Sequence, residues 1–464
     1  MIEYIFAKKL NTFYFTDNPE NLLKKQSLQI GLAESITANV AEGGYIILDF
    51  GKEMNGGIRI LTYLARQARV RIRFGESLTE CCAELGGEKN ATNDHSIRDF
   101  EVNLPDYSDM IFGNTGFRFV RLDFYNQATI KSIVAVNHIF KKKAIYRYEG
   151  KDECIRQIYE TAKRTLDLCT ANAYVWDGVK RDRLVWIGDI HPEMLALTTL
   201  YGRVPILEKS LDFVKAQTPL PGWMNGYPMY SMWWIIIVAD YYERTKTRSF
   251  LQKQVGYLEG LVEQINHCVK ADGTLEYPGY FVDWPTVGQP DEKQGVRAIN
   301  ILAMKKAIFI FQLLGRDITK AQDILNRLLQ QEIIVQKSKQ VAGLKYLAVG
   351  LSDEDKTLLV DGGAKGMSTF MSYYILKAIA SFNKETAIEV MKEYYGAMLD
   401  KGATTFWEDF DIEWAKHSCK IDELPKNGEK DVHGDFGAYC YKGFRHSLCH
   451  GWSAGVLRFI EEEC

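Results

Sequence analysis

The sequence has no long apolar segment, no leader-like start and almost no excess of charge. The longest apolar run, Met232–Ala239, ends at Asp240 and is far shorter than the ~20 residues that a membrane-spanning helix needs. The opening residues, MIEYIFAKK, lack a basic region followed by an apolar stretch of signal-peptide length. The formal net charge of −3 provides no basic surface for nucleic acid. We therefore expect a soluble, cytoplasmic protein that binds neither membranes nor nucleic acid.

Motifs for disulfides, metals and cofactors are missing as well. The nine cysteines are an odd number with no framework spacing and no Cys-x-x-Cys pair, which favours free thiols in a reducing compartment. Asp361–Met367 is rich in glycine but lacks the Gly-Lys-[Ser/Thr] ending of a phosphate-binding loop, and the sequence contains neither a dinucleotide fingerprint nor a Gly-x-Ser-x-Gly elbow. His446 and His450 are four residues apart, but no His-Glu-x-x-His motif or cysteine cluster completes a metal site. We expect no cofactor and no metal.

Aromatic residues, in contrast, are abundant: the 464 residues include 9 Trp, 25 Tyr and 23 Phe. These side chains can fill a large core, or they can offer flat faces on which sugar rings stack. At roughly 100–200 residues per domain, a chain of this length exceeds one ordinary domain. We expect either several domains or one large helical ring with an appendage.

Residues 1–145 alternate apolar and polar side chains with the period of a β-strand. In the segment ARVRIRF, Val70, Ile72 and Phe74 share one face and three arginines share the other. Similar short segments, separated by Gly, Asn and Asp turns, are residues 45–50, 57–63, 117–122 and 132–136. Several short strands with turns between them are typical of an antiparallel β-sandwich, which we predict for this part of the chain.

In residues 146–464 the apolar period changes to 3.6, as in helices. One apolar stripe runs from Ile155 to Cys169 and another from Leu251 to Ile265. Further helices are predicted near residues 192–201, 204–217, 229–245, 294–314, 319–335, 367–381, 385–399 and 444–462. We interpret the segments 171–190, 271–293, 339–366 and 402–443 as long functional loops. The predicted fold class is mainly α with β: helical hairpins in a ring, preceded by the sandwich.

The segment 176–193 is the most informative for function. Its sequence, WDGVKRDRLVWIGDIHPE, places Asp177, Asp182 and Asp189 among three basic residues and between two tryptophans, and we expect a helix to begin at Pro192. Such a loop could hold a carboxylic acid beside a sugar ring, with aromatic faces for stacking and carboxylates for hydroxyl groups. A salt-bridged loop on the rim of the ring would have the same composition, so both interpretations stay open.

A second acidic segment, GATTFWEDFDIEW at residues 402–414, contains Glu408 directly after Trp407. Crowded carboxyl groups perturb one another's pKa, which suits acid–base chemistry, although an acidic surface turn would look the same. Glycoside hydrolysis needs two carboxylates on opposite sides of the scissile bond, ~6.5–9.5 Å apart in inverting enzymes. Because loops at one end of a helical ring converge, Asp182 and Glu408 could meet there.

Two further segments could contact a ligand. In YFVDW, Asp283 and Trp284 pair a hydroxyl acceptor with a stacking surface, but the same pair could cap a core element. In HSLCHGW, His450 could face a substrate or could be an ordinary buried histidine.

Together these motifs resemble those of the α-L-rhamnosidases of glycoside hydrolase family 78, in the six-hairpin glycosidase superfamily. The family's loop reads approximately Asp-x-Pro-x-Arg-Glu-Arg-x-x-Trp-x-Gly-Asp, and the residues at the same spacing here are Asp177, Arg181, Asp182, Arg183, Trp186, Gly188 and Asp189. The family's Ala-Thr-Thr-x-Trp-Glu, Asp-Trp and Ser-Leu-x-His are similar to Ala403–Glu408, Asp283–Trp284 and Ser447–His450. Upstream, LDFGKEM at 48–54 and FRFV at 117–120 resemble the sandwich that precedes the family's catalytic ring.

The resemblance implies an (α/α)6 barrel at residues 146–464, a β-sandwich at residues 1–145 and hydrolysis with inversion at the anomeric carbon. It assigns the general acid to Asp182 and the general base to Glu408. The residues that it implies for sugar binding are Asp177, Arg181, Trp186, Asp189, Asp283, Trp284, Trp407 and His450. The family's acid is usually Glu where this chain has Asp182, and its Pro is replaced by Val179; if the acid has moved, Glu193 and Glu276 are candidates.

We therefore expect an enzyme that removes terminal α-L-rhamnosyl-type residues from small glycosides or oligosaccharides and that could form homo-oligomers. Trp176 and Trp452 would join the tryptophans named above as apolar walls for the sugar. Three alternatives remain: a hydrolase of another terminal sugar such as a fucoside or unsaturated uronide, a sugar epimerase or isomerase that uses His446 and His450, and a catalytically silent sugar-binding protein.

Overall fold

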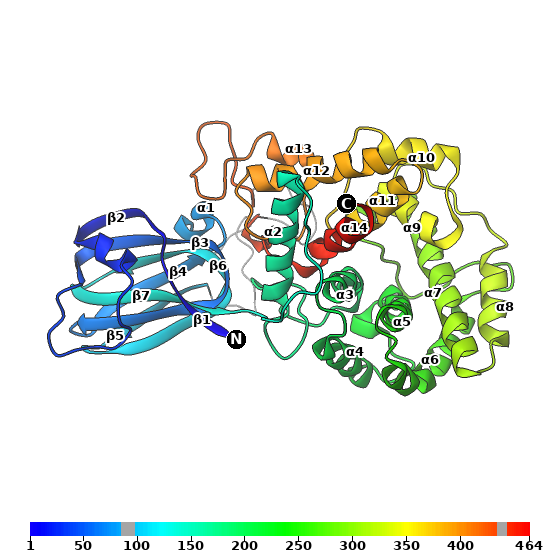
Figure 1. Ribbon diagram of the computed structural model, residues 1–464, viewed down its shortest axis with the longest axis horizontal. Helices are drawn as coiled ribbons and strands as arrows, with labels where there is room; N and C mark the ends of the chain where they lie inside the picture. Colours follow the sequence, from blue (N-terminus) through cyan, green and yellow to red (C-terminus); the bar gives the residue numbers. More distant parts are fainter. Residues whose placement is uncertain (85–97, 434–442) are drawn as a thin grey trace.

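The fold places a β-sheet first and a set of helices after it (Figure 1). A computed structural model describes residues 1–84, 98–433 and 443–464. The strands are β1 Ile2–Phe6, β2 Lys9–Asp17, β3 Ala38–Leu64, β4 Ala68–Gly75, β5 Asp99–Leu104, β6 Asp109–Phe124 and β7 Ala128–His138. The helices are α1 Leu78–Cys82, α2 Glu153–Cys169, α3 Ile187–Tyr201, α4 Pro205–Gln217, α5 Pro228–Thr245, α6 Arg248–Cys268, α7 Glu292–Leu314, α8 Thr319–Leu328, α9 Lys339–Val349, α10 Asp353–Val360, α11 Ser372–Ala380, α12 Lys384–Asp400, α13 Ile412–Ala415 and α14 Val456–Glu463.

All strand pairs of the N-terminal sheet, β1–β7, are antiparallel, which confirms the predicted strand type. The strand order is β1-β7-β3-β6-β4-β5, and β2 pairs with β3 beside that path. β3 contains both segments that the period-two pattern predicts, at 45–50 and 57–63. Its first half pairs with β2, and residues at both of its ends pair with β7. The register of β3 against β6 shifts between Asp49 and Met54, as at a β-bulge, which bends a strand. Alternate side chains such as Phe74 and Phe117 fill the core of the sheet.

The helices form an inner set and an outer set. In the inner set, α3 packs on α5, α5 on α7, α7 on α9, α9 on α11 and α11 on α14, and α14 returns to α3, so the contacts close into a ring. All fifteen residues of α3 are buried, including Asp189, His191 and Glu193, as befits a helix enclosed by the ring. Outer helices such as α2 and α8 bury a single stripe against this ring.

Three sequence-based predictions about helices are wrong. Residues 339–366 are not a long loop, because α9 and α10 lie within them. The helix expected to begin at Pro192 begins at Ile187 and carries the proline inside it. Residues 444–462 do not form one helix: two short 3₁₀ turns and an extended segment precede α14.

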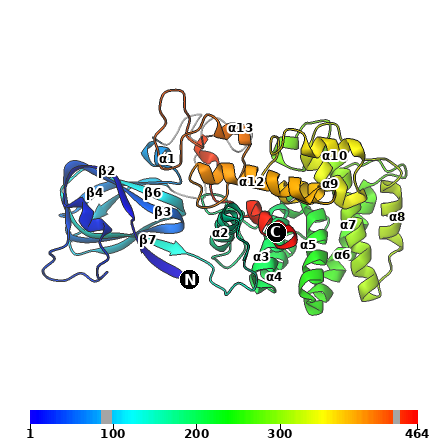
Figure 2. The same cartoon turned by 45° about the horizontal axis from the view of Figure 1, so that its top comes forward.

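The sheet and the helices lie at opposite ends of the long axis, with α2 at their junction (Figures 1 and 2). Side chains of the sheet and α1, including Leu78 and Phe119, belong to the same apolar cluster as the helices. The Asn55 side chain donates a hydrogen bond to the Leu168 carbonyl, 3.0 Å away, across this junction. Among the described residues, no helix has the length and apolarity needed to cross a bilayer.

Candidate active site

The loop between α2 and α3 is folded back on itself at residues 177–184, which we call the Asp177 loop. The Asp177 amide donates to the Leu184 carbonyl at 3.1 Å, and the Leu184 amide donates to the Asp177 carboxylate at 2.8 Å. At its tip, Asp182 and Arg183 have φ values of 51° and 56°, a left-handed conformation that is uncommon for residues other than glycine and clusters at functional sites. The Arg183 guanidinium packs over the Trp176 ring, 4.4 Å from its centroid, and donates to the Asn114 carbonyl of the sheet.

Glu408 lies in a segment that pairs with residues 446–451, the His450 segment. The Glu408 amide donates to the Ser447 carbonyl at 2.9 Å, and the Ser447 amide donates back to the Glu408 carboxylate at 3.0 Å. On its other side the His450 segment pairs with the Asp177 loop, because the Gly451 amide donates to the Asp177 carbonyl at 2.6 Å. This double pairing brings together residues 181 and 408, which are 227 positions apart in the sequence.

The Asp177 loop, the His450 segment and α3 surround a cavity of about 260 Å³. Its lining comprises Asp177, Arg181, Asp182, Trp186, Asp189, Tyr227, Tyr230, Phe281, Trp284, Glu408, Arg445, His450 and Trp452. His450 Nε2 is 3.8 Å from carboxylate oxygens of Asp177 and Asp189 and 3.9 Å from one of Glu408. The Arg181 guanidinium forms ion pairs with both Asp182 and Glu408, so one cation bridges the two carboxylates.

Burial dominates the electrostatics of these groups. It raises the pKa of Glu408 above the ordinary glutamate value, although the Arg181 charge opposes this shift. Burial and neighbouring carboxylates raise the pKa of Asp177 and Asp189 well above the usual range. Burial and the Arg181 charge lower the pKa of His450 well below 6.5, which leaves a neutral imidazole. The site therefore combines protonatable acids with one neutral histidine.

Aromatic side chains form the remaining wall of the cavity. The Trp186 and Tyr230 rings meet edge to face at 6.1 Å, and the Phe281 and Trp284 rings do so at 5.2 Å. The Tyr230 ring can lie against α3 only because residue 188 is glycine: a Cβ there would be 2.4 Å from a ring carbon. One half of the cavity is thus acidic and the other half is aromatic, as suits a sugar with polar and apolar faces.

No protein-family model and no curated protein matches this sequence, but solved structures do. The rhamnosidase from Klebsiella oxytoca with rhamnose bound superposes with a TM-score of 0.73 at 18% identity, over 91% of this chain and 88% of that chain. The GH78 rhamnosidase of Bacillus sp. GL1 gives 0.71 at 17% identity, over 96% of this chain and 48% of that one. The α-L-rhamnosidase of Streptomyces avermitilis complexed with L-rhamnose gives 0.64 at 15%, over 89% and 42%.

The chain has the GH78 α-L-rhamnosidase fold. It spans nearly the full length of the Klebsiella protein and about half of the two longer ones. The structural likeness thus agrees with the resemblance that the motifs alone indicate.

Within the GH78-like fold, most sequence-predicted site residues line the cavity: Asp177, Arg181, Asp182, Trp186, Asp189, Trp284, Glu408 and His450. Asp283 and Trp407 do not. The Asp283 carboxylate caps a 3₁₀ turn at Thr286 and accepts from the Ser368 hydroxyl at 2.8 Å, and burial raises its pKa to about 6. The Trp407 ring is buried against Phe410, with centroids 5.3 Å apart.

The other candidate acids and the second histidine lie outside the cavity lining. Glu193 is buried beside Gly451, and its carboxylate accepts no hydrogen bond from the described residues. Glu276 forms an ion pair with Lys270 on the surface. His446 is buried, and its Nε2 accepts the Asp409 amide at 3.1 Å.

Sequence reasoning missed four lining residues, Tyr227, Tyr230, Phe281 and Arg445. The tyrosines open the apolar helix α5, where they look like ordinary core residues. The only signal for Arg445 is its position directly before His446; its carbonyl accepts from Arg181 Nε at 2.8 Å.

A buried cluster of charges lies next to the site and joins it to the N-terminal sheet. Glu76, Glu80 and His433 are close enough to share a metal ion. Lys180 Nζ, however, lies 3.3 Å from Glu76, 2.9 Å from Glu80 and 3.2 Å from the His433 ring nitrogen. A lysine ammonium therefore takes the place that a cation would fill, and these residues do not fit a metal centre.

This cluster also holds the His450 segment in place. The Glu76 carboxylate accepts the Leu448 amide at 2.6 Å and the Ser447 hydroxyl at 3.2 Å. Lys180 Nζ donates to the His446 carbonyl at 2.8 Å. The Ser447 amide in turn donates to the Glu408 carboxylate. Glu76, which follows β4, therefore supports the candidate catalytic carboxylate through Ser447.

Proposed function

We propose that the protein is an inverting glycoside hydrolase that removes terminal α-L-rhamnosyl-type residues from small glycosides or oligosaccharides. The observation that carries this proposal is the meeting of Asp177, Asp182, Asp189 and Glu408 with Arg181 around one cavity with aromatic walls. The GH78-like fold adds support, because solved proteins of this fold hold rhamnose. The proposal includes an (α/α)6 barrel at residues 146–464 for the ring of helices and a β-sandwich at residues 1–145 for the sheet.

In the proposed mechanism, Asp182 protonates the glycosidic oxygen while Glu408 removes a proton from the attacking water. The Arg181 guanidinium forms ion pairs with both carboxylates and so fixes them on the wall of one cavity, where sugar and water can enter beside them. The raised pKa of Glu408 makes its carboxylate a stronger base than an ordinary glutamate. Asp182 is the less buried of the two, with 19% of its side chain exposed, as suits an acid that faces the leaving group.

The cavity has the size and the polarity for a single deoxysugar. At about 260 Å³ it lies near the lower end of ligand pockets, which span roughly 300–1,000 Å³. Asp177, Asp189 and His450 can bond the hydroxyl groups, and the Trp186 and Trp284 rings can cover the ring face and the C6 methyl group. Asp283 and Trp407 lie behind the wall and are not part of the proposed site.

A hydrolase is favoured over an epimerase by the position of the histidines. A two-histidine epimerase needs both imidazoles at the substrate, but of His446 and His450 only His450 lines the cavity. His446 instead accepts a backbone amide in the interior.

The test is turnover of an aryl α-L-rhamnoside by the wild type and by the Glu408→Gln and Asp182→Asn variants. Loss of a general acid or base costs roughly 10²–10⁴-fold, so both variants should lose activity on that scale, while the surface control Glu276→Gln keeps it. Proton NMR of the first-formed product should show the β-anomer of rhamnose. Wild-type turnover in both variants would refute the roles assigned to Asp182 and Glu408. An α-anomer as the first product would refute inversion. Faster turnover of an aryl fucoside than of the rhamnoside would refute rhamnose as the preferred sugar.

A further inference from the structure

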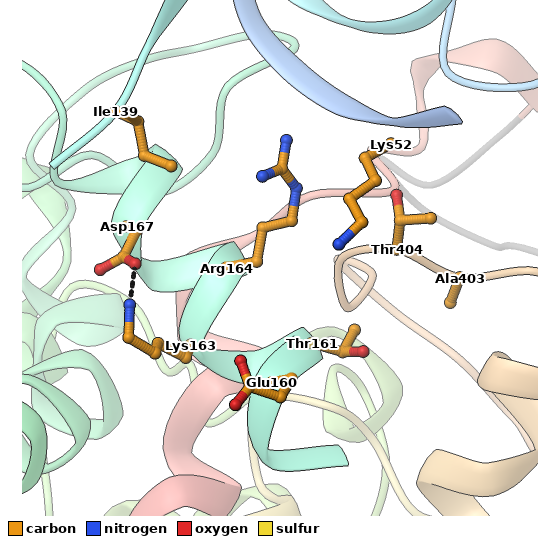
Figure 3. A pocket seen from close by; sticks show the side chains of 9 residues that line it. All are labelled: Lys52, Ile139, Glu160, Thr161, Lys163, Arg164, Asp167, Ala403 and Thr404. Atoms are coloured by element: carbon orange, nitrogen blue, oxygen red, sulfur yellow. Dashed lines mark hydrogen bonds and ion pairs between the residues drawn. The ribbon is translucent and has the colours of Figure 1, made fainter. Parts of the chain in front are cut away.

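A second cavity, of about 350 Å³, lies at the junction between the N-terminal sheet and α2 (Figure 3). It shares no lining residue with the candidate active site. Figure 3 shows Lys52 reaching into this space from the sheet and Arg164 reaching into it from α2. Two cations from separate parts of the chain therefore face one hollow.

Arg164 has little compensation for its charge. One of its terminal nitrogens donates to the Glu53 carbonyl and lies 3.9 Å from the Met54 sulfur, while its Nε is buried without a hydrogen-bond partner in the described parts of the chain. No carboxylate of the described residues lies within ion-pair distance of its guanidinium. Arg164 is partly buried, and the nearby acids Glu53, Glu3 and Asp167 act on its charge only from beyond ion-pair distance, which leaves the guanidinium open to an external anion.

Lys52 is in a similar position. Within residues 1–84, 98–433 and 443–464 its ammonium forms neither a hydrogen bond nor an ion pair. Burial lowers the pKa of Lys52, the charges of Arg164 and Lys8 lower it further, and the Glu160 carboxylate opposes the shift only in part. Lys163, a third cation of the lining, is already neutralised by Asp167 at 2.5 Å.

The rest of the lining suits a polyhydroxy ligand. The Thr404 hydroxyl accepts the Glu53 amide at 2.9 Å and keeps its own proton to donate. Thr161 and Glu160, on the exposed side of α2, add a hydroxyl and a carboxylate that can bond sugar hydroxyls. The adjoining surface, with the run Lys141–Lys143, is basic and would attract anions.

We propose that this cavity binds a monosaccharide-sized ligand that carries one anionic group, a carboxylate or a phosphate, between Arg164 and Lys52. The ligand's hydroxyls bond Thr161, Thr404 and Glu160. This site is separate from the candidate active site, and its existence does not depend on the proposed reaction.

The experiment is isothermal titration calorimetry on the full chain with four probes: galacturonate, glucose 6-phosphate, inorganic phosphate and glucose. Saturable binding of at least one anionic probe at millimolar concentration or below is expected, with no binding of glucose and weaker binding at high salt. Binding of galacturonate alone would identify a sugar carboxylate, and binding of a phosphate compound alone would identify a phosphate. No saturable binding of any anion, or equal binding of glucose, would overturn the proposal.

Variants locate the site. Lys52→Gln and Arg164→Gln should each weaken binding of the anionic probe at least tenfold, and the control Lys253→Gln, on the exposed face of α6, should leave it unchanged. The Lys52 side chain forms no hydrogen bond or ion pair in the described structure, so Lys52→Gln should fold and tests the site even if Arg164→Gln fails to fold. Unchanged affinity in Lys52→Gln would refute the site. Turnover of an aryl rhamnoside, expected to be unaffected in Lys52→Gln, keeps this result distinct from the proposed function.

Discussion

The buried ion cluster between Lys180 and Glu76 predicts a large and non-additive effect of mutation on stability. Both side chains are almost completely buried, at 1% and 0% exposure, and their charged atoms are 3.3 Å apart. We consider the variants Glu76→Gln and Lys180→Met, alone and together. Burial already lowers the pKa of Lys180 to about 7. Each single change leaves one buried ionisable group without its partner, whereas the double change removes both.

The expected magnitude follows in two ways. Breaking a buried pair by removing one partner costs roughly 3–5 kcal/mol, although Glu80 remains beside Lys180 and reduces that cost. The Lys180 charge and hydrogen bonds from His433 and Leu448 overcome burial and lower the pKa of Glu76 from 4.5 to about 2, which at 1.36 kcal/mol per unit is about 3 kcal/mol. We therefore expect Glu76→Gln to lower the free energy of unfolding by about 3 kcal/mol at pH 7.

The sign of the pH dependence follows from the lowered pKa. A carboxyl group that is more acidic in the folded state stabilises the fold fully above its unfolded pKa of 4.5, and this contribution is lost as the pH falls towards about 2. The difference in stability between wild type and Glu76→Gln should therefore shrink below pH 4.5. Glutamine at position 76 does not titrate, so this convergence reports on the one carboxyl group.

Urea unfolding followed by tryptophan fluorescence measures these effects, with Glu276→Gln as a surface control that should change stability by less than about 0.5 kcal/mol. In the double-mutant cycle we expect the combined loss to be smaller than the sum of the single losses by about 1–3 kcal/mol. Strict additivity, or a Glu76→Gln variant as stable as the control at pH 7, would refute the inferred pairing. A parallel fall in the turnover of Glu76→Gln is expected because Ser447 and Leu448 lose their anchor.

Three further predictions concern the candidate active site. Glu408 acts as a base only when it is deprotonated, and its pKa is raised. We therefore expect kcat/KM to fall as the pH decreases through a value above 4.5. A pH–rate profile whose acid limb lies at or below 4.5 would contradict this expectation. Gly188→Ala should lower kcat/KM about tenfold or more, because the new Cβ displaces the Tyr230 ring and such overpacking costs roughly 1–3 kcal/mol. The control Gly256→Ala, whose Cβ would meet open space on α6, should leave kcat/KM unchanged in the same assay. Trp284→Ala should weaken rhamnose binding by about 1 kcal/mol in calorimetry and raise KM more than it lowers kcat; unchanged affinity would remove this ring from the sugar site.

Periodicity predicts the strands and the amphipathic outer helices well, and it fails where burial removes the pattern. α9 is buried on nearly all sides, so it shows no apolar stripe, and the short α10 is defined by a capping box at Ser352 rather than by periodicity. His446 and His450 have helical spacing, but their segment is extended because it hydrogen-bonds to loops on both sides. Such tertiary pairing is invisible in local sequence.

The site was predictable where one short motif holds several of its residues. Asp177 and Arg181 belong to a loop that closes on itself and Asp189 lies in the first turn of α3 directly after it, so their closeness in the sequence carries over into space. Asp283 and Trp407 also lie in segments rich in acidic and aromatic residues. In the structure, however, the Asp283 carboxylate caps a turn and the Trp407 indole fills the core, and the sequence does not distinguish these roles from ligand binding. Which way a loop side chain turns depends on packing partners far along the chain.

The pairing of the Asp177 loop with the His450 segment has a consequence for biosynthesis. Arg181 and Arg445, which hydrogen-bond to each other, are separated by 264 residues, and a ribosome adds roughly 5–20 residues per second. For roughly 13 to 53 seconds the first half of the proposed catalytic machinery is therefore made without the His450 segment that completes it. A nascent chain must keep that cluster of acids hydrated until residues 446–451 emerge, and a translation product that stops short of them would be inert even with every helix before them folded.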